Sequence, residues 1–532
     1  MGMANSEGDG SMSLAAHIER LLRFGYANEL LKEEDCIPVR NALLDLFGLE
    51  EPVSEDAYRL IQQEPIPASA SEIVDRMLDE ACRSGMLTDH SMTVRDLWDA
   101  RIMGLLMPRQ SEVTSRFWET AKHSIQQATD NYYAMSIASN YIRMDRIRNN
   151  EYWTTPTSYG ELEMTINLSK PEKDPEEIAA ERNAPKRHYP KCLLCLENVG
   201  YAGRLNHPAR QNHRVIPVDI AGDQWYLQYS PYVYYREHSI LFSGEHRPMR
   251  IEPATFERLL DFVGRFPHYF VGSNADLPIV GGSILNHDHF QGGRHVFPME
   301  QAEANGWYCH SNYSEIQAAS VKWPLSVIRL SGRDRATLAQ LAAELLARWR
   351  QYEDTDADII AHSSSEGRSV PHNTITPIAR VNAAGDYELD LVLRNNRTSK
   401  EHPHGIFHPH QELHHIKKEN IGLIEVMGLA VLPGRLQSEL SAIRNILTGN
   451  RLYDVQELHS DEMMSKHSAW ISELVQQWGT ALSDDQAMRV LQDAVGAKFL
   501  QVLTHAGVFK PTPTGRAAFD RWMKSAGFEK IE

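Results

Sequence analysis

Apolar residues recur at helical spacing towards both ends of the chain. Near the N-terminus they follow the i, i+4, i+7, i+8 pattern of one helix face, at Leu14, Ile18, Leu21 and Leu22. Comparable periodic segments follow at residues 40–47, 71–82 and 94–106. The same spacing returns at Leu436, Leu440, Ile443 and Leu447, and at Val495, Phe499, Val502 and Leu503. We therefore predict helical regions over residues 1–138 and 436–532.

Between these regions, aromatic or aliphatic residues alternate with polar ones, which is typical of antiparallel strands. The alternation is clearest over residues 224–242 and 387–393. A nearly continuous apolar run follows at residues 421–433, interrupted by one carboxylate, Glu425. Together with the flanking helical regions, this pattern predicts an α+β protein.

Length and charge narrow the class of protein. A chain of 532 residues exceeds one ordinary hydrophobic core, so we expect two or three domains. The formal net charge of −17 argues against a general nucleic-acid binder, because such a protein needs basic surface. No apolar run approaches the ~20 residues that span a membrane, so we expect no membrane partner. The five cysteines, a sparse and odd number, fit a reducing cytoplasm.

Two segments have a composition that is typical of exposed, flexible parts of a chain. The first ten residues are acidic and glycine-rich without an apolar core, so we expect a flexible leader and not a signal peptide. Residues 168–188 are rich in Lys, Glu and Pro, a composition that predicts an exposed linker or loop.

The candidate chemistry centres on His287, His289 and Gln291, which stand at alternate positions. In an extended segment, alternate side chains point to one face. Neutral imidazole is a nucleophile that can carry a phosphoryl group, and Gln291 can hold a non-bridging oxygen. The flanking pairs Gly281-Gly282 and Gly292-Gly293 let backbone N–H groups approach phosphate. The row predicts nucleotidyl or phosphoryl transfer through a histidine, with a polar turn as the alternative.

The longer context favours the first interpretation. Residues 276–293, Asp-Leu-Pro-Ile-Val-Gly-Gly-Ser-Ile-Leu-Asn-His-Asp-His-Phe-Gln-Gly-Gly, closely resemble the active-site signature of class II galactose-1-phosphate uridylyltransferases. These belong to a branch of the histidine-triad superfamily in which Gln replaces the third His, as at Gln291. Asn286 departs from the signature, which has a small residue there.

The resemblance implies a fold of two related histidine-triad-like halves with antiparallel sheets. Residues 139–330 would form the N-terminal catalytic half, which contains the motif, and residues 331–435 the C-terminal, hexose-binding half. The helical regions 1–138 and 436–532 would be additions at either end. The protein is also expected to form a homodimer.

The implied activity is a ping-pong exchange of hexose 1-phosphates on UMP, in galactose metabolism. UDP-glucose and galactose 1-phosphate would give glucose 1-phosphate and UDP-galactose through a uridylyl-His289 intermediate. No organic cofactor is expected. Two alternatives stay open: a histidine-triad nucleotide hydrolase or phosphorylase, and a non-catalytic metal-binding protein.

Further residues would contact substrate. Arg143 and Arg146 stand three apart, so they would share a helix face and could clamp a diphosphate, or they could simply be a solvated face. By similarity with the family, Asn274 and Ser283 would hold phosphate or sugar oxygens. Glu425 would recognise the hexose, the alternative being an ion pair with Lys417 or Lys418.

A metal site is the last candidate. Cys192 and Cys195 form a C-x-x-C pair, which can be half a zinc site, a redox pair or a chance pairing. Many class I uridylyltransferases complete such a pair with two histidines. Carried over by position these are His246 and His287, so the resemblance implies a structural zinc. The histidine-rich segment 401–415 contains His-Pro-His twice but lacks the full motif, and we expect either a metal or a polar substrate loop there.

Overall fold

The computed structural model describes residues 13–168, 187–282, 284–365 and 367–531. The predicted leader and most of the predicted linker lie outside the described residues. The described chain divides between two compact units. The first contains the residues up to Arg148 together with 187–217 and 226–233, and the second contains the remainder.

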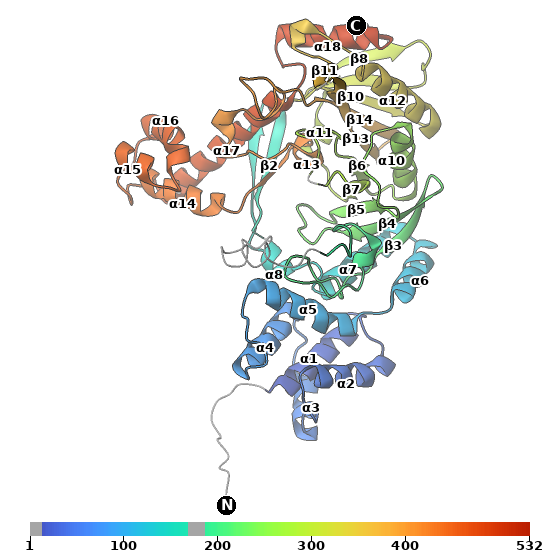
Figure 1. Ribbon diagram of the computed structural model, residues 1–532, viewed down its shortest axis with the longest axis vertical. Helices are drawn as coiled ribbons and strands as arrows, with labels where there is room; N and C mark the ends of the chain where they lie inside the picture. The colour runs from blue at the N-terminus through green and yellow to red at the C-terminus, as the bar shows by residue number, and fades with distance from the viewer. Residues whose placement is uncertain (1–12, 169–186, 283, 366, 532) are drawn as a thin grey trace, which may run out of the picture. The chain divides into compact units, whose positions relative to one another are not determined.

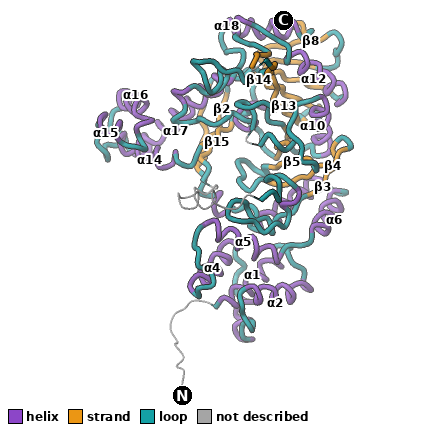
Figure 2. The backbone as a smooth tube through the Cα atoms, in the orientation of Figure 1, coloured by secondary structure: helices purple, strands orange, loops and turns teal. Residues whose placement is uncertain are grey.

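The first unit is mainly helical (Figure 2). Its helices are α1 (Leu14–Ala27), α2 (Cys36–Leu46), α3 (Glu55–Gln63), α4 (Ala70–Arg83), α5 (Met92–Leu106), α6 (Gln110–Ala121), α7 (Ile125–Ala138) and α8 (Met144–Ile147). The predicted stripe of α1 is buried and shares one core with apolar side chains of α2, α4 and α5. Tertiary packing of this face stabilises helices that would be marginal alone. The predicted N-terminal helical region is confirmed.

All but parts of β3 and β4 of an eleven-stranded sheet belong to the second unit, and the strand order is β16-β8-β9-β10-β14-β13-β6-β7-β5-β4-β3 (Figure 1). The strands are β3 (Ile216–Ile220), β4 (Asp223–Tyr229), β5 (Ser239–Ser243), β6 (Phe270–Gly272), β7 (His289–Gly293), β8 (Ala304–His310), β9 (Gln317–Val321), β10 (Val327–Gly332), β13 (Asn373–Val381), β14 (Tyr387–Asn395) and β16 (Phe528–Ile531). Helix α10 (Pro253–Arg265) joins β5 to β6, and α12 (Arg335–Trp349) lies between β10 and β13.

The sheet contains the same arrangement twice. In each repeat three consecutive strands are followed by a helix and two more strands, and the last strand inserts beside the third: β3-β4-β5-β7-β6 and β8-β9-β10-β14-β13. The repeats meet where β6 pairs antiparallel with β13. The predicted α+β fold with two related halves is confirmed, but the second repeat begins at β8, upstream of the expected boundary at residue 330.

The two faces of this sheet differ in what covers them. Helices α10 and α12 contact each other and both contact β13 on one face (Figure 1). Alternate strand residues such as Val271, Ala379 and Leu389 are fully buried. The short helix α13 (Leu423–Val426) covers the other face, because a Cβ on Gly272 would meet Leu423 at 2.8 Å. His289 and Gln291 of the sequence motif lie on this second face, because Gln291 pairs with Gly272.

The remaining elements surround the sheet. Strands β1 (Glu151–Thr157), β2 (Gly160–Ile166) and β15 (Leu429–Leu432) form a small sheet, and β11 (His362–Ser365) pairs with β12 (Arg368–Pro371). The remaining helices are α11 (Pro298–Gln301), α14 (Leu436–Leu447), α15 (Val455–Ser460), α16 (Ser468–Trp478), α17 (Asp484–Ala506) and α18 (Pro513–Ser525). The C-terminal helical prediction is confirmed, with β16 as an addition that pairs with β8.

Two predicted extended segments are shorter than their patterns suggested. Between β6 and β7 the described residues 273–282 and 284–288 lie outside the named strands, and the chain turns at Ile279, where φ is +73°. Within residues 224–242 only β4 and β5 are strands, separated by turns. Val280 in the first place and Tyr235 in the second are buried although they lie in turns, which alternation alone does not reveal.

Candidate active site

Strand β7 places His289 and Gln291 together. It lies between β5 and β6 and is antiparallel to both. The two side chains are two residues apart and therefore project from the same face, the one that α13 covers. His289 is only 5% exposed. The predicted alternation of these two residues is confirmed.

Hydrogen bonding fixes which nitrogen of His289 can react. Its Nδ1 lies 2.8 Å from the carbonyl oxygen of His287, which can only accept, so Nδ1 carries the proton and donates. The lone pair is then on Nε2. Burial lowers the pKa of His289 to about 4, so the imidazole is neutral at physiological pH. A neutral, oriented imidazole is the form that attacks phosphorus.

His287 departs from the expected row. It precedes β7, which begins at His289, so it is not part of the extended segment. Its Nε2 donates to the carbonyl oxygen of Ser243 at 2.9 Å, and its ring centroid lies 5.0 Å from that of His246. The expectation of three aligned polar groups was therefore wrong for His287, because the chain enters the sheet only after this residue.

The sequence did not point to His238, a buried imidazole on the same side of the motif as Gln291. Burial lowers the pKa of His238 to about 3, against a smaller opposing effect of the Gln291 carboxamide. The Gln291 carboxamide is close enough to interact with His238, although neither Gln291 Oε1 nor a ring nitrogen of His238 makes a hydrogen bond of standard geometry among the described residues. Buried polar atoms of this kind are costly unless a ligand satisfies them. His238 lies just before β5, and a polar residue at a strand entrance was the only available sign.

Asn274 connects the motif loop to α13. Its Oδ1 accepts a hydrogen bond from the backbone N–H of Leu423 at 2.8 Å. A Cβ on Gly282 would lie 2.7 Å from Asn274 Nδ2, so glycine is required for this approach. Ser283 lies outside the described residues. The position of Asn274 suits a residue that orders the loop beside His289.

Glu425 is paired within the protein. Its Oε1 lies 2.9 Å from Lys417 Nζ, and its Oε2 accepts the backbone N–H of Gly422 at 3.2 Å. Both oxygens of the carboxylate are therefore used, and Lys417 is itself buried. This is the structural alternative that the apolar run left open.

We expect the Glu425→Gln variant to lose about 1–3 kcal/mol of unfolding free energy, because Lys417 would stay buried without its counter-charge. The KM for the hexose 1-phosphate that the resemblance implies should stay near the wild-type value. Urea denaturation and steady-state kinetics measure the two effects. Glu419→Gln is the matched control, since Glu419 is exposed and 3.9 Å from the same ammonium. Unchanged stability with a raised KM would instead assign Glu425 to hexose recognition.

Arg143 and Arg146 are also paired. Arg143 lies 3.2 Å from both Asp96 and Asp99, and Arg146 donates to both oxygens of Asp96. These contacts fasten α8 to α5 within the first unit. Because both guanidiniums are already paired with carboxylates, a structural role is favoured over a diphosphate clamp.

The four predicted metal ligands form two pairs along the chain. In the first unit the sulfurs of Cys192 and Cys195 are 3.5 Å apart. Burial, and to a smaller extent the hydrogen bond with Cys192, raise the pKa of Cys195 to about 11. In the second unit His246 and His287 are ring neighbours. The four form a candidate metal-binding group. Two thiols and two imidazoles are a donor set compatible with structural zinc.

The histidine-rich segment is a loop, and neither His-Pro-His copy lies on a strand. His410, Glu412 and His505 offer ligand atoms within 4.8 Å of one another. However, Nε2 of His410 already donates a hydrogen bond to the carbonyl oxygen of Ile406, and the backbone N–H of His410 donates to Nδ1 of His505. Because the protein satisfies these groups internally, the polar-loop interpretation is favoured over a metal.

Comparison with known proteins agrees with this geometry. Residues 30–248 match the family described as "Galactose-1-phosphate uridyl transferase, N-terminal domain", and residues 262–464 match its C-terminal domain. Galactose-1-phosphate uridylyltransferase of Caldanaerobacter subterraneus subsp. tengcongensis is 57% identical over 97% of this chain and 99% of its own length. The proteins of that name from Halalkalibacterium halodurans and Bacillus subtilis are 50% and 48% identical, over 96% and 98% of this chain and 99% of each relative.

Two further findings add little to the assignment. The crystal structure of yeast Ap4A phosphorylase Apa2 aligns with a TM-score of 0.29 and 14% identity, over 55% of this chain and 83% of that chain, which is too weak to support a conclusion. None of the described helices is long and apolar enough to cross a membrane. The two family matches and the relatives, which align over nearly the whole chain, are decisive: the chain belongs to the galactose-1-phosphate uridylyltransferase family of nucleotidyltransferases.

Proposed function

We propose that the protein transfers a uridylyl group between hexose 1-phosphates, converting UDP-glucose and galactose 1-phosphate into glucose 1-phosphate and UDP-galactose. The observation that carries this proposal is the hydrogen bond from His289 Nδ1 to the His287 carbonyl oxygen, which leaves Nε2 as the nucleophile. Gln291 projects from the same strand face without adding a charge. The family to which the chain belongs supports the same reaction.

The reaction proceeds in two displacements. Nε2 of His289 attacks the α-phosphorus of UDP-glucose in line, and the bond from that phosphorus to the β-phosphate oxygen breaks. Glucose 1-phosphate departs with the electron pair, leaving a uridylyl-histidine. A phosphate oxygen of galactose 1-phosphate then attacks the same phosphorus and expels the imidazole. Because this acceptor oxygen is already ionised at neutral pH, no general base is required.

Gln291 would hold a non-bridging oxygen during both displacements. Its Oε1 is buried and makes no hydrogen bond of standard geometry among the described residues. Its amide N–H groups can donate to the oxygens on which charge accumulates. Asn274 would order the loop that precedes His289.

Intact-protein mass spectrometry tests the mechanism directly. The purified enzyme mixed with UDP-glucose alone should gain the mass of one uridylyl group, and galactose 1-phosphate should remove it. Accumulation of UMP without an adduct would instead indicate a nucleotide hydrolase. A chain that shows neither adduct nor turnover would be a binding protein.

For Gln291→Ala we expect kcat to fall by about 10²–10³, with a smaller change in KM, because the lost donor acts mainly on developing charge. Gln291→Glu should be slower still, since a carboxylate would repel the phosphoryl oxygens. Steady-state kinetics of both variants provide the comparison. Wild-type kcat in Gln291→Ala would remove this side chain from the mechanism.

We also propose that Cys192, Cys195, His246 and His287 hold a structural zinc ion. Two thiolates and two imidazoles complete a four-coordinate site and leave no position for substrate, so zinc would stabilise the region and take no chemical step. Binding would require loss of the Cys195 proton, which burial opposes unless a cation is present.

Cys192→Ser should abolish zinc binding, measured as about one ion per wild-type chain by plasma mass spectrometry, and lower the thermal midpoint. Treatment of the wild-type protein with a chelator should reproduce both changes. Cys309→Ser is the control, because Cys309 is an exposed cysteine outside the set. Equal zinc content in the two variants would contradict the proposed ligands.

The cellular setting follows from chemistry. None of the five cysteines, all of which lie in the described part of the chain, forms a disulfide, and we propose a cytoplasmic enzyme in a reducing compartment. We propose a homodimer as its oligomeric state, and light scattering of the purified chain measures this.

A further inference from the structure

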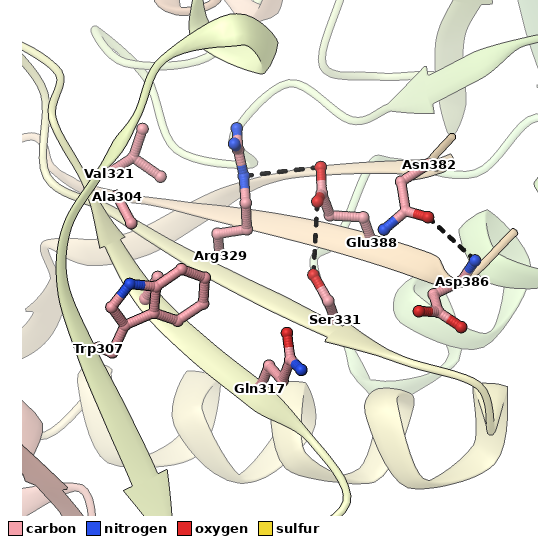
Figure 3. A pocket seen from close by; sticks show the side chains of 10 residues that line it. Ala304, Trp307, Gln317, Val321, Arg329, Ser331, Asn382, Asp386 and Glu388 are labelled. Carbon is pink, nitrogen blue, oxygen red and sulfur yellow. Dashed lines mark hydrogen bonds and ion pairs between the residues drawn. The ribbon is translucent and has the colours of Figure 1, made fainter. Parts of the chain in front are cut away.

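The second repeat contains a cavity of ≈ 270 Å³ that the proposed reaction does not use. Figure 3 shows its lining, which includes Trp307, Gln317, Ser331, Asn382, Asp386 and Glu388. These residues come from β8, β9, β10, the β13–β14 turn and β14. A volume just below the ~300 Å³ of small drug-sized sites suits one sugar ring.

Strand register places this cavity on the same sheet face as the catalytic strand. Directly paired residues occupy one row across seven strands: Gln291, Gly272, Ile378, Asp390, Arg329, Ala319 and Trp307. Paired residues in neighbouring strands point to the same side. In the repeated topology β14 takes the place of β7, so the cavity is the counterpart of the catalytic site.

The charges of the counterpart exclude the chemistry of the first repeat. Glu388 and Asp390 occupy β14, where β7 has His289 and Gln291, so no imidazole is available as nucleophile. Arg329 donates to both oxygens of Asp390, and Arg380 pairs with Asp390 and Glu388. The guanidiniums of Arg329 and Arg380 are thus already paired with carboxylates. A phosphate would meet Asp386 and Glu388 without a free guanidinium, so the cavity disfavours anions.

What is left suits an uncharged polyol. Trp307 is 51% exposed and presents its indole beside the small apolar side chains of Ala304 and Val321 (Figure 3). Such a face can cover the C–H side of a pyranose ring. Opposite it, Oδ1 of Asn382 accepts hydrogen bonds from the backbone N–H groups of Ala384 and Asp386. The side-chain amide hydrogens of Asn382 are therefore available to a ligand. Asp386 pairs with Arg333, and this ion pair is weak because the Arg333 side chain is largely exposed.

We propose that this cavity binds a neutral hexose or hexoside, with Trp307 stacked on the ring and Asn382 and Asp386 on its hydroxyls. The carboxylate of Asp386 can accept from two adjacent hydroxyls, and Asn382 can donate to their oxygens. The site is separate from His289 and takes a ligand without a phosphate group. The inference does not depend on the proposed reaction.

Titration calorimetry with methyl β-galactoside and methyl β-glucoside tests the site on the full chain. The His289→Ala background prevents turnover, so saturating UDP-glucose can be present throughout. We expect saturable binding of at least one glycoside in the presence of UDP-glucose. Trp307→Ala should weaken it by about tenfold or more, and Asn382→Ala should weaken it to a lesser extent.

Trp478→Ala is the matched control, because Trp478 on α16 is 47% exposed and remote in sequence from the cavity. It should bind the glycoside like the parent protein. Displacement of the glycoside by UDP-glucose, or equal binding by Trp307→Ala and the parent, would overturn the proposal. So would absence of binding combined with a changed oligomeric state of Trp307→Ala in light scattering, which would assign this face to a contact between copies.

Discussion

His289→Ala should abolish uridylyl exchange, with kcat reduced on the order of 10⁴–10⁶-fold. The reason is that the variant removes the atom that forms the covalent intermediate, and among the described residues no other neutral imidazole lies on β7. Substrate affinity should change little, since the nucleophile contributes mainly after binding. The uridylyl mass gain with UDP-glucose should also disappear.

A buried histidine needs a control for folding. His310 on β8 is 5% exposed, the same fraction as His289, so His310→Ala removes an equally buried imidazole from the other repeat. It should keep exchange activity near the wild-type value, apart from any change in the amount of folded protein. Circular dichroism of both variants separates folding from chemistry. Near-normal turnover by His289→Ala would refute the assigned nucleophile.

Asp390→Asn should produce the largest loss of stability, about 3–5 kcal/mol of unfolding free energy. Asp390 is 0% exposed and lies 2.7 Å from Arg329 Nε and 2.8 Å from Arg380. The neutral amide would leave the guanidiniums of Arg329 and Arg380 with Glu388 and the more distant Glu300 as their remaining counter-charges. Urea denaturation followed by circular dichroism measures the change. A loss under about 1 kcal/mol would show that the pair network is dispensable.

The pH dependence of this contribution has a defined sign. Burial alone would raise the pKa of Asp390, but the guanidiniums of Arg380 and Arg329 hold it below its usual value. The folded pKa is therefore depressed, so the stabilisation is complete above the unfolded pKa of ~3.9 and is lost as pH falls through the folded pKa. Asp386→Asn is the control, because this half-exposed carboxylate pairs only with exposed Arg333 and should contribute about 0–1 kcal/mol.

Periodic patterns in the sequence predicted the elements well. The spacing of Leu14, Ile18, Leu21 and Leu22 located α1, and the alternation at residues 387–393 located β14. These predictions succeed because a helix or strand buries one face, so its apolar residues recur at a spacing that can be recognised within a short stretch of sequence. The motif residues His289 and Gln291 were found for the same reason, since both belong to one strand.

Partners far apart along the chain were not predictable in this way. Spacing left Arg143 and Arg146 open between a phosphate clamp and a polar face, and only the packing of α8 on α5 supplied Asp96 and Asp99. Likewise, the pairing of Lys417 with Glu425 depends on the turn between them. Local composition cannot choose among several charged neighbours, because the choice depends on where other elements bring them.

The sequence by itself determined the α+β class, the helical regions at both ends, the strand that carries His289 and Gln291 and, through its motif, the family. Tertiary structure alone decided that β7 begins at His289 and leaves His287 outside, that the second repeat starts at β8, and that β14 presents Glu388 and Asp390 where β7 presents a histidine and a glutamine. Strand order and register bring these residues into one row across the sheet. They arise from packing the whole chain, so no single segment encodes them.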